Sequence, residues 1–145
     1  MTVASVHSVE RTVHKTNEWL KDLDAELGIE DRDDAWRILH GFLPVLRDRL
    51  TMDEGAQLAA ELTPLVRGVF YEGFDPGHQP EKIRDPETFI ERLGQRMEIS
   101  DPEEAALAAV AVTAVMARHV AEGELDDVLG HLPKPLREVL QPVKL

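Results

Sequence analysis

The sequence predicts an all-α protein, a helical bundle of two pseudo-symmetric modules with three to four helices in each. Apolar residues recur at a spacing near 3.6 along most of the chain, which is typical of amphipathic helices. Helix-start signals precede several of these stretches. The same order of signals then repeats in the second half of the chain. A length of 145 residues suits a single helical domain, which we assign to residues 1–145.

The first two predicted helices follow from local signals. An apolar stripe predicts a helix over 8–27, and Gly28 suits the left-handed residue that commonly follows a helix. Asp31 is the predicted N-cap of a second, longer helix. Pro44 lies inside that helix, where it removes one backbone hydrogen bond, so we expect a kink there.

Two further helices complete the first module. Thr51 and Glu54 fit a capping box that opens the third helix. Pro64 suits the first position of a short fourth helix, whose apolar residues reach Phe70. Residues 71–84 break the helical periodicity and contain two glycines and two prolines, so we predict a loop there.

The second half of the chain starts its helices in the same way. The pairs Asp85-Pro86 and Asp101-Pro102 each join an N-cap residue to a proline at the first helical position. Together with the apolar pattern that follows, they predict four helices, over about 86–97, 102–120, 124–132 and 135–140.

The two halves match in one register without a gap. In this repeat register Asp31 falls on Asp101, and Leu62 falls on Leu132. We interpret this as a duplicated module, with copies at about 8–70 and 85–140 joined by the loop 71–84. A module of about 55 residues would bury only a marginal core by itself. We therefore expect the modules to cover each other's apolar faces.

Composition limits the classes of partner. The chain has 28 acidic and 16 basic residues, a formal charge of −12, so its average surface repels nucleic acid. Nucleic-acid binding would need a basic patch that the sequence alone does not assemble, made of Arg47, Arg49, Arg84, Arg92 and Arg96. The absence of cysteine excludes disulfides and thiolate metal sites. We expect a cytoplasmic protein with no leader peptide, no membrane contact and no nucleic-acid partner.

Few residues have a spacing that catalysis or metal binding requires. His7, Glu10 and His14 could share one helical face and offer imidazole and carboxylate ligands to a metal ion, but a solvated first turn explains them without one. No serine lies in a nucleophile-elbow pattern, and no glycine-rich phosphate loop is present. We expect no cofactor and no catalytic residue.

The most distinctive segment of the chain, residues 67–80, joins the two halves. Three aromatic residues fall within five positions, and the second half has no counterpart of them. The segment could bind a ligand or partner through Arg67, Tyr71, Glu72, Phe74, Asp75 and His78. It could also be a structural strap in which Phe70 and Phe74 fill the joint between the modules.

The segment from Arg67 to Pro76, together with residues 12–17 and 46–51, resembles a bacterial family of small acidic helical proteins catalogued as a domain of unknown function. The resemblance covers nearly the whole chain. It implies an all-α fold with a duplicated helical module and supplies no reaction, cofactor or catalytic residue. Related sequences often look like Tyr-Tyr-Glu-Gly-Trp-Asp-Pro at this segment. Phe70 and Phe74 replace the first tyrosine and the tryptophan here, which favours ring packing over polar recognition.

Two questions stay open at the level of sequence. The alanine-rich stretch 105–117 could be buried in the core or form a seam between two copies, so both a monomer and a homodimer fit. For function, we favour a non-enzymatic protein-interaction or regulatory module with an unidentified protein or small-molecule partner. The alternative is a small enzyme or metal-dependent ligand binder that uses residues 67–80.

Overall fold

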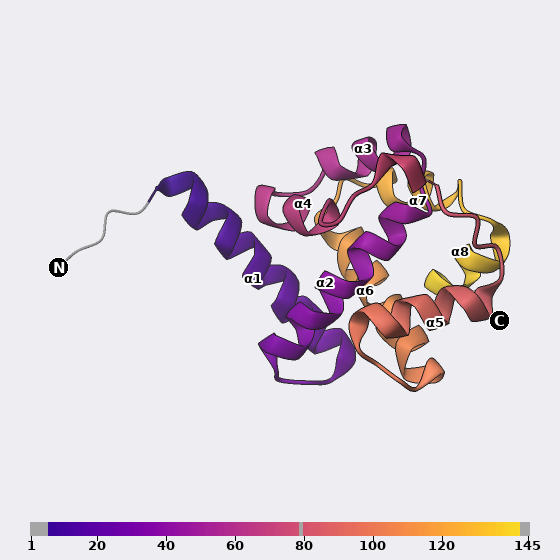
Figure 1. Ribbon diagram of the computed structural model, residues 1–145. Helices are drawn as coiled ribbons and strands as arrows, with labels where there is room; N and C mark the ends of the chain where they lie inside the picture. Colours follow the sequence, from indigo (N-terminus) through magenta and orange to yellow (C-terminus); the bar gives the residue numbers. More distant parts are fainter. Residues whose placement is uncertain (1–5, 79, 143–145) are drawn as a thin grey trace.

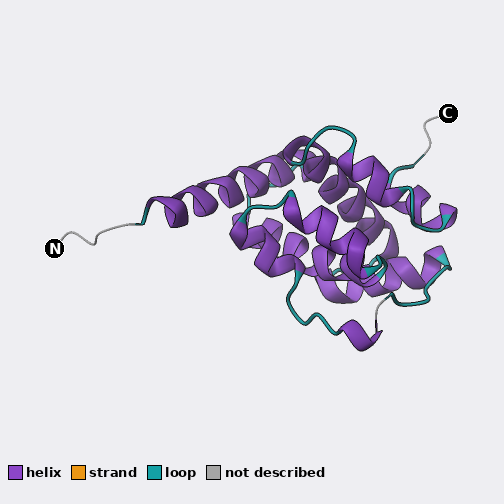
Figure 2. Cartoon of the chain, turned by 90° about the horizontal axis from the view of Figure 1, so that it is seen from above, coloured by secondary structure: helices purple, strands orange, loops and turns teal. Residues whose placement is uncertain are grey.

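The computed structural model describes residues 6–78 and 80–142, and this part of the chain folds into helices with no strand (Figures 1 and 2). The predicted all-α bundle is confirmed. The helices are α1 (His7–Leu27), α2 (Arg32–Asp48), α3 (Met52–Ala60), α4 (Pro64–Phe70), the 3₁₀ helix η1 (Pro76–His78), α5 (Pro86–Met97), α6 (Pro102–His119), α7 (Glu124–Leu129) and α8 (Lys134–Leu140).

The predicted helix starts are present because each is a local hydrogen-bonding motif. The carboxylates of Asp31, Asp85 and Asp101 accept bonds from backbone N–H groups in the first turns of α2, α5 and α6. Thr51 and Glu54 form the complete capping box at the start of α3. These bonds satisfy donors that a helix leaves unpaired at its first turn.

Some boundaries differ from the predicted ones. Gly28 has φ of 68° and ends α1 as expected, and Pro44 lies inside α2, which continues to Asp48. The seventh helix ends at Leu129 instead of residue 132. The predicted loop 71–84 contains the short helix η1, which sequence patterns missed because three residues are too few to show a period.

The helix bounds recur in the repeat register that pairs Asp31 with Asp101. Helix α4 spans residues 64–70 and α8 spans residues 134–140, while α1 and α5 end at residues 27 and 97. The packing recurs as well. Helix α1 packs on α6 and α2 packs on α5, whereas α4 contacts α1 and α2 just as α8 contacts α5 and α6. In the repeat register, α1 corresponds to α5 and α2 corresponds to α6. The two contacts that join the halves, α1 with α6 and α5 with α2, are therefore equivalent.

The core lies where α2, α5 and α6 meet. Helix α6 is buried on most of its sides, and Ala109, in the middle of the alanine-rich stretch, has no exposed surface. Helices α2 and α5 approach very closely at Gly41, where a Cβ atom would lie 2.3 Å from the carbonyl oxygen of Arg96. Only glycine fits this crossing.

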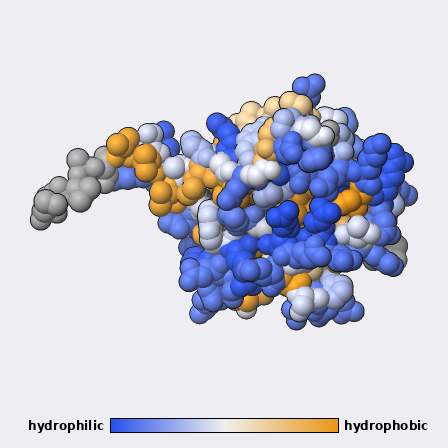
Figure 3. Space-filling view, viewed as in Figure 1, coloured by the Kyte–Doolittle hydropathy of each residue, from blue (hydrophilic) through white to orange (hydrophobic). Residues whose placement is uncertain are grey.

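Helix α1 reaches beyond the rest of the bundle. Its N-terminal half projects away from the other helices in both ribbon views (Figures 1 and 2). Val9 and Val13 on this half are exposed, and the projection carries orange atoms beside blue ones in the hydropathy view (Figure 3). Within the described residues, no helix combines the length and the apolar character that crossing a bilayer requires.

Candidate functional site

Arg67, one of the predicted site residues, stabilises the end of a helix. Its Nε donates to the carbonyl oxygen of Ala59 at 2.8 Å, and its Nη2 donates to that of Leu62 at 2.8 Å. These carbonyls lie at the C-terminal end of α3, where backbone acceptors lack partners within the helix. The contacts give Arg67 a structural role.

The aromatic residues of the segment pack on one another. Phe70 is fully buried in the core, while Tyr71 and Phe74 are half-buried. The Tyr71 ring lies edge-on to both neighbours, with centroids 5.2 Å from Phe70 and 5.5 Å from Phe74. Such edge-to-face pairs are a favourable arrangement of ring quadrupoles. The three rings therefore form one packed cluster.

Arg47 of α2 holds this segment against the helix, although it is not among the six residues predicted for the segment. Its side chain is only 4% exposed and donates to the carbonyl oxygens of Phe70, at 3.0 Å, and Glu72, at 2.6 Å. The same guanidinium bonds Asp48 and lies 5.6 Å from the centroid of the Phe74 ring. One buried cation thus binds the backbone and a ring of the inter-module segment.

The remaining predicted residues divide between two places. Glu72 pairs with His40, with Oε2 and Nε2 2.5 Å apart, beside a small hollow of about 280 Å³ that Arg92 and Arg96 also line. His78 pairs with Asp75 at 3.3 Å on the exposed turn of η1 and borders a different hollow. The structure does not bring the six predicted residues into one cleft.

The alternative metal site also lacks the necessary geometry. Among residues 6–78 and 80–142, no three His, Cys, Asp or Glu side chains lie close enough to hold a metal ion. His14 instead contacts Glu18 on the next turn of α1, at 3.2 Å. His7, Glu10 and His14 therefore lie on the projecting part of α1 without forming a ligand set.

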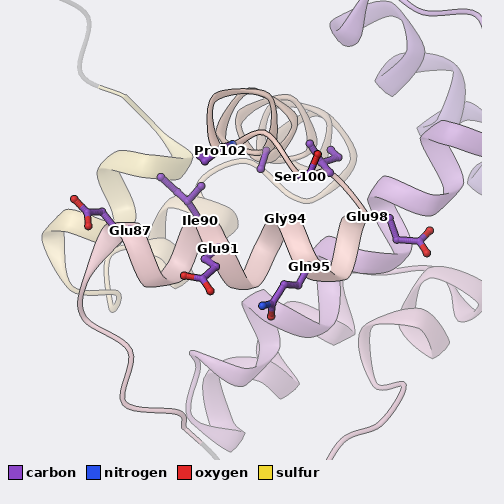
Figure 4. A pocket seen from close by; sticks show the side chains of 10 residues that line it. Glu87, Ile90, Glu91, Gly94, Gln95, Glu98, Ser100 and Pro102 are labelled. Atoms are coloured by element: carbon purple, nitrogen blue, oxygen red, sulfur yellow. The ribbon is translucent and has the colours of Figure 1, made fainter.

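A largely apolar hollow lies between α5 and the start of α6, with a volume of about 770 Å³. Ile90 points from α5 toward Pro102 at the start of α6, and Glu87 and Glu98 lie at the two ends of α5 (Figure 4). Gly94 lets the chain before α6 approach α5, because a Cβ there would lie 2.7 Å from the carbonyl oxygen of Ile99. Close packing therefore shapes the floor of the hollow.

A second apolar hollow of about 450 Å³ continues from the first, since Ile90 lines both. It is lined by Ala106, Leu107 and Val110 of α6 and by Val139 of α8. Leu107 is the most exposed large apolar residue of the described chain, with 67% of its surface exposed. We call the two hollows together the α5–α6–α8 groove.

Carboxylates surround this groove. Its lining includes five glutamates in or directly after α5, α6 and α8, which are Glu87, Glu91, Glu98, Glu103 and Glu138. Glu87, Glu91 and Glu103 make no ion pair within the described residues. An apolar floor with an acidic border is typical of a surface that binds an amphipathic segment. The apolar pattern of the sequence predicted the helix over 86–97 but gave no signal for the groove.

Comparison with known proteins gives one result at the level of family. The family model described as an uncharacterized conserved protein, DUF2267, matches residues 16–139. This match covers both halves of the chain and the segment between them. No curated protein matches the chain.

Proposed function

We propose that this chain, which belongs to the DUF2267 family of uncharacterized conserved proteins, is a non-enzymatic protein-interaction module. Its α5–α6–α8 groove binds a basic amphipathic helix of a partner protein. The observation that carries the proposal is a continuous apolar surface across three helices, with Leu107 exposed at 67% and glutamates around it. Exposed apolar patches with polar borders commonly mark protein-binding sites.

The first module supports the proposal because it carries different residues at the positions that match the groove. In the repeat register, Ala106 and Leu107 correspond to Trp36 and Arg37. Trp36 packs against the core with its large ring, and Arg37 bonds the carbonyl oxygen of Met97 at 3.0 Å. In the second module, the small Ala106 therefore stands in the place of the large Trp36, and the apolar Leu107 stands in the place of the charged Arg37.

Burial differs between the modules in the same direction. Leu20 and Val69, the counterparts of Ile90 and Val139, are 7% and 5% exposed. Ile90 and Val139 are only half-buried, and both line the groove. At these two positions the second module leaves more apolar surface open than the first, which supports a binding role for the groove.

The negative charge around the groove favours a basic partner. The glutamates that border the groove and the net charge of −12 attract a segment that carries lysine or arginine beside its apolar face. An amphipathic helix presents apolar residues at i, i+3 or i+4 and i+7, a stripe that fits a groove between helices. A lysine-flanked helix satisfies both requirements.

Fluorescence anisotropy tests the proposal with two labelled helical peptides that share the same apolar stripe. One carries lysine on its flanks and the other carries glutamate. We expect the lysine peptide to bind and its affinity to fall as salt is added, because the border charges are exposed. Leu107→Arg imports the residue of the first module and should weaken binding by about tenfold or more.

Val9→Arg is the matched control, since it adds the same charge at an exposed apolar residue of α1, outside the groove. This variant should bind the lysine peptide as the wild type does. Equal affinity for both peptides, or an equal loss in Leu107→Arg and Val9→Arg, would overturn the proposal.

The two-module organisation belongs to the same proposal. We propose that modules at about 8–70 and 85–140 arose by duplication and that one copy kept a closed surface while the other opened its groove. The matching helix bounds and the reciprocal α1–α6 and α2–α5 contacts support this history. In this arrangement the segment 67–80 is a strap, which the contacts of Arg47 and Arg67 support.

A further inference from the structure

The hollow that His78 borders has a volume of about 990 Å³ and shares no lining residue with the α5–α6–α8 groove. Its basic side chains come from three separate parts of the chain. Arg49 follows α2, Lys82 and Arg84 lie in the stretch that leads to α5, and His131 follows α7. Two residues of the basic patch that the sequence could not assemble, Arg49 and Arg84, therefore meet here.

The guanidinium of Arg49 makes no hydrogen bond and no ion pair in the described part of the chain. Its Nε and Nη1 are shielded from solvent and make no hydrogen bond. A guanidinium carries five N–H donors, and leaving such donors unpaired away from water is costly. Burial lowers the pKa of Arg49, and the nearby Arg84 lowers this pKa further while Glu81 raises it. Arg49 is thus a cation that lacks an acceptor.

The carboxylates that line the hollow already have other partners. Glu54 accepts from the backbone N–H of Thr51 at 2.8 Å and pairs with His131 at 3.0 Å. Both oxygens of Glu81 accept from Nη1 of Arg92, at 3.0 and 2.9 Å. No ion pair to Arg49, Lys82 or Arg84 is present among the described residues.

We propose that this hollow is a binding site for a phosphoryl group, with Arg49 as its principal donor and Lys82 and Arg84 as the supporting charges. Nη2 of Arg49, the guanidinium nitrogen that is not shielded from solvent, can donate a charge-assisted hydrogen bond to a phosphoryl oxygen. The two other cations offset the remaining negative charge of a dianion. The ligand is either inorganic phosphate or a small phosphomonoester, which share this chemistry.

Isothermal titration calorimetry with two probes, inorganic phosphate and glycerol phosphate, tests the site at fixed ionic strength. We expect saturable binding of at least one probe. The probe that binds with the higher affinity shows whether the site takes inorganic phosphate or a phosphomonoester. Arg49→Gln should weaken binding roughly 10- to 100-fold, because a charged hydrogen bond is lost. Lys82→Gln, at an exposed position, should also weaken it without affecting the fold.

Arg11→Gln is the control, because it removes one positive charge from an exposed arginine of α1, outside the hollow. A stability measurement separates binding from folding. Without phosphate, the thermal midpoint of Arg49→Gln should equal or exceed that of the wild type, since the wild type buries unpaired donors. With phosphate, the midpoint should rise in the wild type and in Arg11→Gln but not in Arg49→Gln.

Three results would overturn the proposal: no saturable binding of either probe, equal weakening in Arg49→Gln and Arg11→Gln, or an equal rise of the thermal midpoint in all variants. The last result would mean that phosphate acts as a general stabilising salt. None of these results depends on whether the α5–α6–α8 groove binds a peptide.

Discussion

Replacement of Gly41 by alanine tests how closely α2 and α5 pack against each other. The added Cβ would lie 2.3 Å from the carbonyl oxygen of Arg96, 2.5 Å from its carbonyl carbon and 2.7 Å from the backbone nitrogen of Met97. Carbon–oxygen contacts between packed backbones lie near 3.3–3.6 Å, so α2 and α5 would have to separate by about 1 Å. Because all three atoms belong to backbone, no side-chain rotation relieves the clash.

The expected magnitude follows from two opposing effects. Inserting a methyl group into a well-packed interface costs about 1–3 kcal/mol, and the absence of any flexible neighbour favours the upper end. Alanine in a helix interior is better than glycine by about 1 kcal/mol. We therefore expect Gly41→Ala to lower the free energy of unfolding by about 2 kcal/mol.

Urea denaturation followed by circular dichroism measures this change, with Gly68→Ala as the matched control. Gly68 lies in α4, and a Cβ there would meet nothing within 4 Å. The control should therefore show only the helix-propensity gain, an increase of up to about 1 kcal/mol. If both substitutions raised the free energy of unfolding equally, the close α2–α5 crossing would be refuted.

Two further predictions concern the strap and the start of α5. Arg47→Met should lower the free energy of unfolding by about 3 kcal/mol, because it leaves the carbonyl groups of the strap without their donor. Limited proteolysis of this variant should then cut the chain within residues 71–85. A variant that the protease does not cut there would contradict the prediction. The Thr88 hydroxyl and backbone N–H bond Asp85 and lower the pKa of its carboxyl group, so the associated stability is present above the ordinary pKa of aspartate and is lost as the pH falls through the lowered value. Thr88→Val should raise this pKa toward its ordinary value in an NMR titration, and an unchanged pKa would assign the shift to another cause.

Local signals made most of the fold predictable. The caps at Asp31, Thr51, Asp85 and Asp101 depend on residues two or three positions away, so the sequence contains the whole motif. The apolar period located the core positions for the same reason. Helices that begin with such a motif were therefore assigned to nearly the correct residues.

The sites were less predictable because they depend on distant contacts. The partners of Arg47 are the carbonyl oxygens of Phe70 and Glu72, 23 and 25 positions further along the chain. A backbone acceptor leaves no mark in the sequence, so the role of Arg47 could not be inferred. The polar residues of 67–80 were predicted as site residues because of their side-chain chemistry. In the structure, however, Arg67 stabilises the end of a helix.

The groove was hidden for a related reason. Ile90, Leu107 and Val139 each lie on an apolar stripe, and such a stripe does not distinguish a covered face from an open one. The difference between the modules at Trp36 and Ala106 was present in the sequence, at matching positions of the repeat. Its meaning required the structure, since only burial shows which stripe is left uncovered.

Chemical-shift mapping tests the central claim of the account, that the α5–α6–α8 groove is the partner-binding surface. The lysine-flanked helical peptide is titrated into isotope-labelled protein, and backbone amide shifts are followed by residue. We predict that the largest shifts occur around Ile90, Leu107 and Val139 and that the matching surface of the first module, around Trp36, is unaffected. Shifts confined to α1, spread evenly over both modules, or absent altogether would contradict the account.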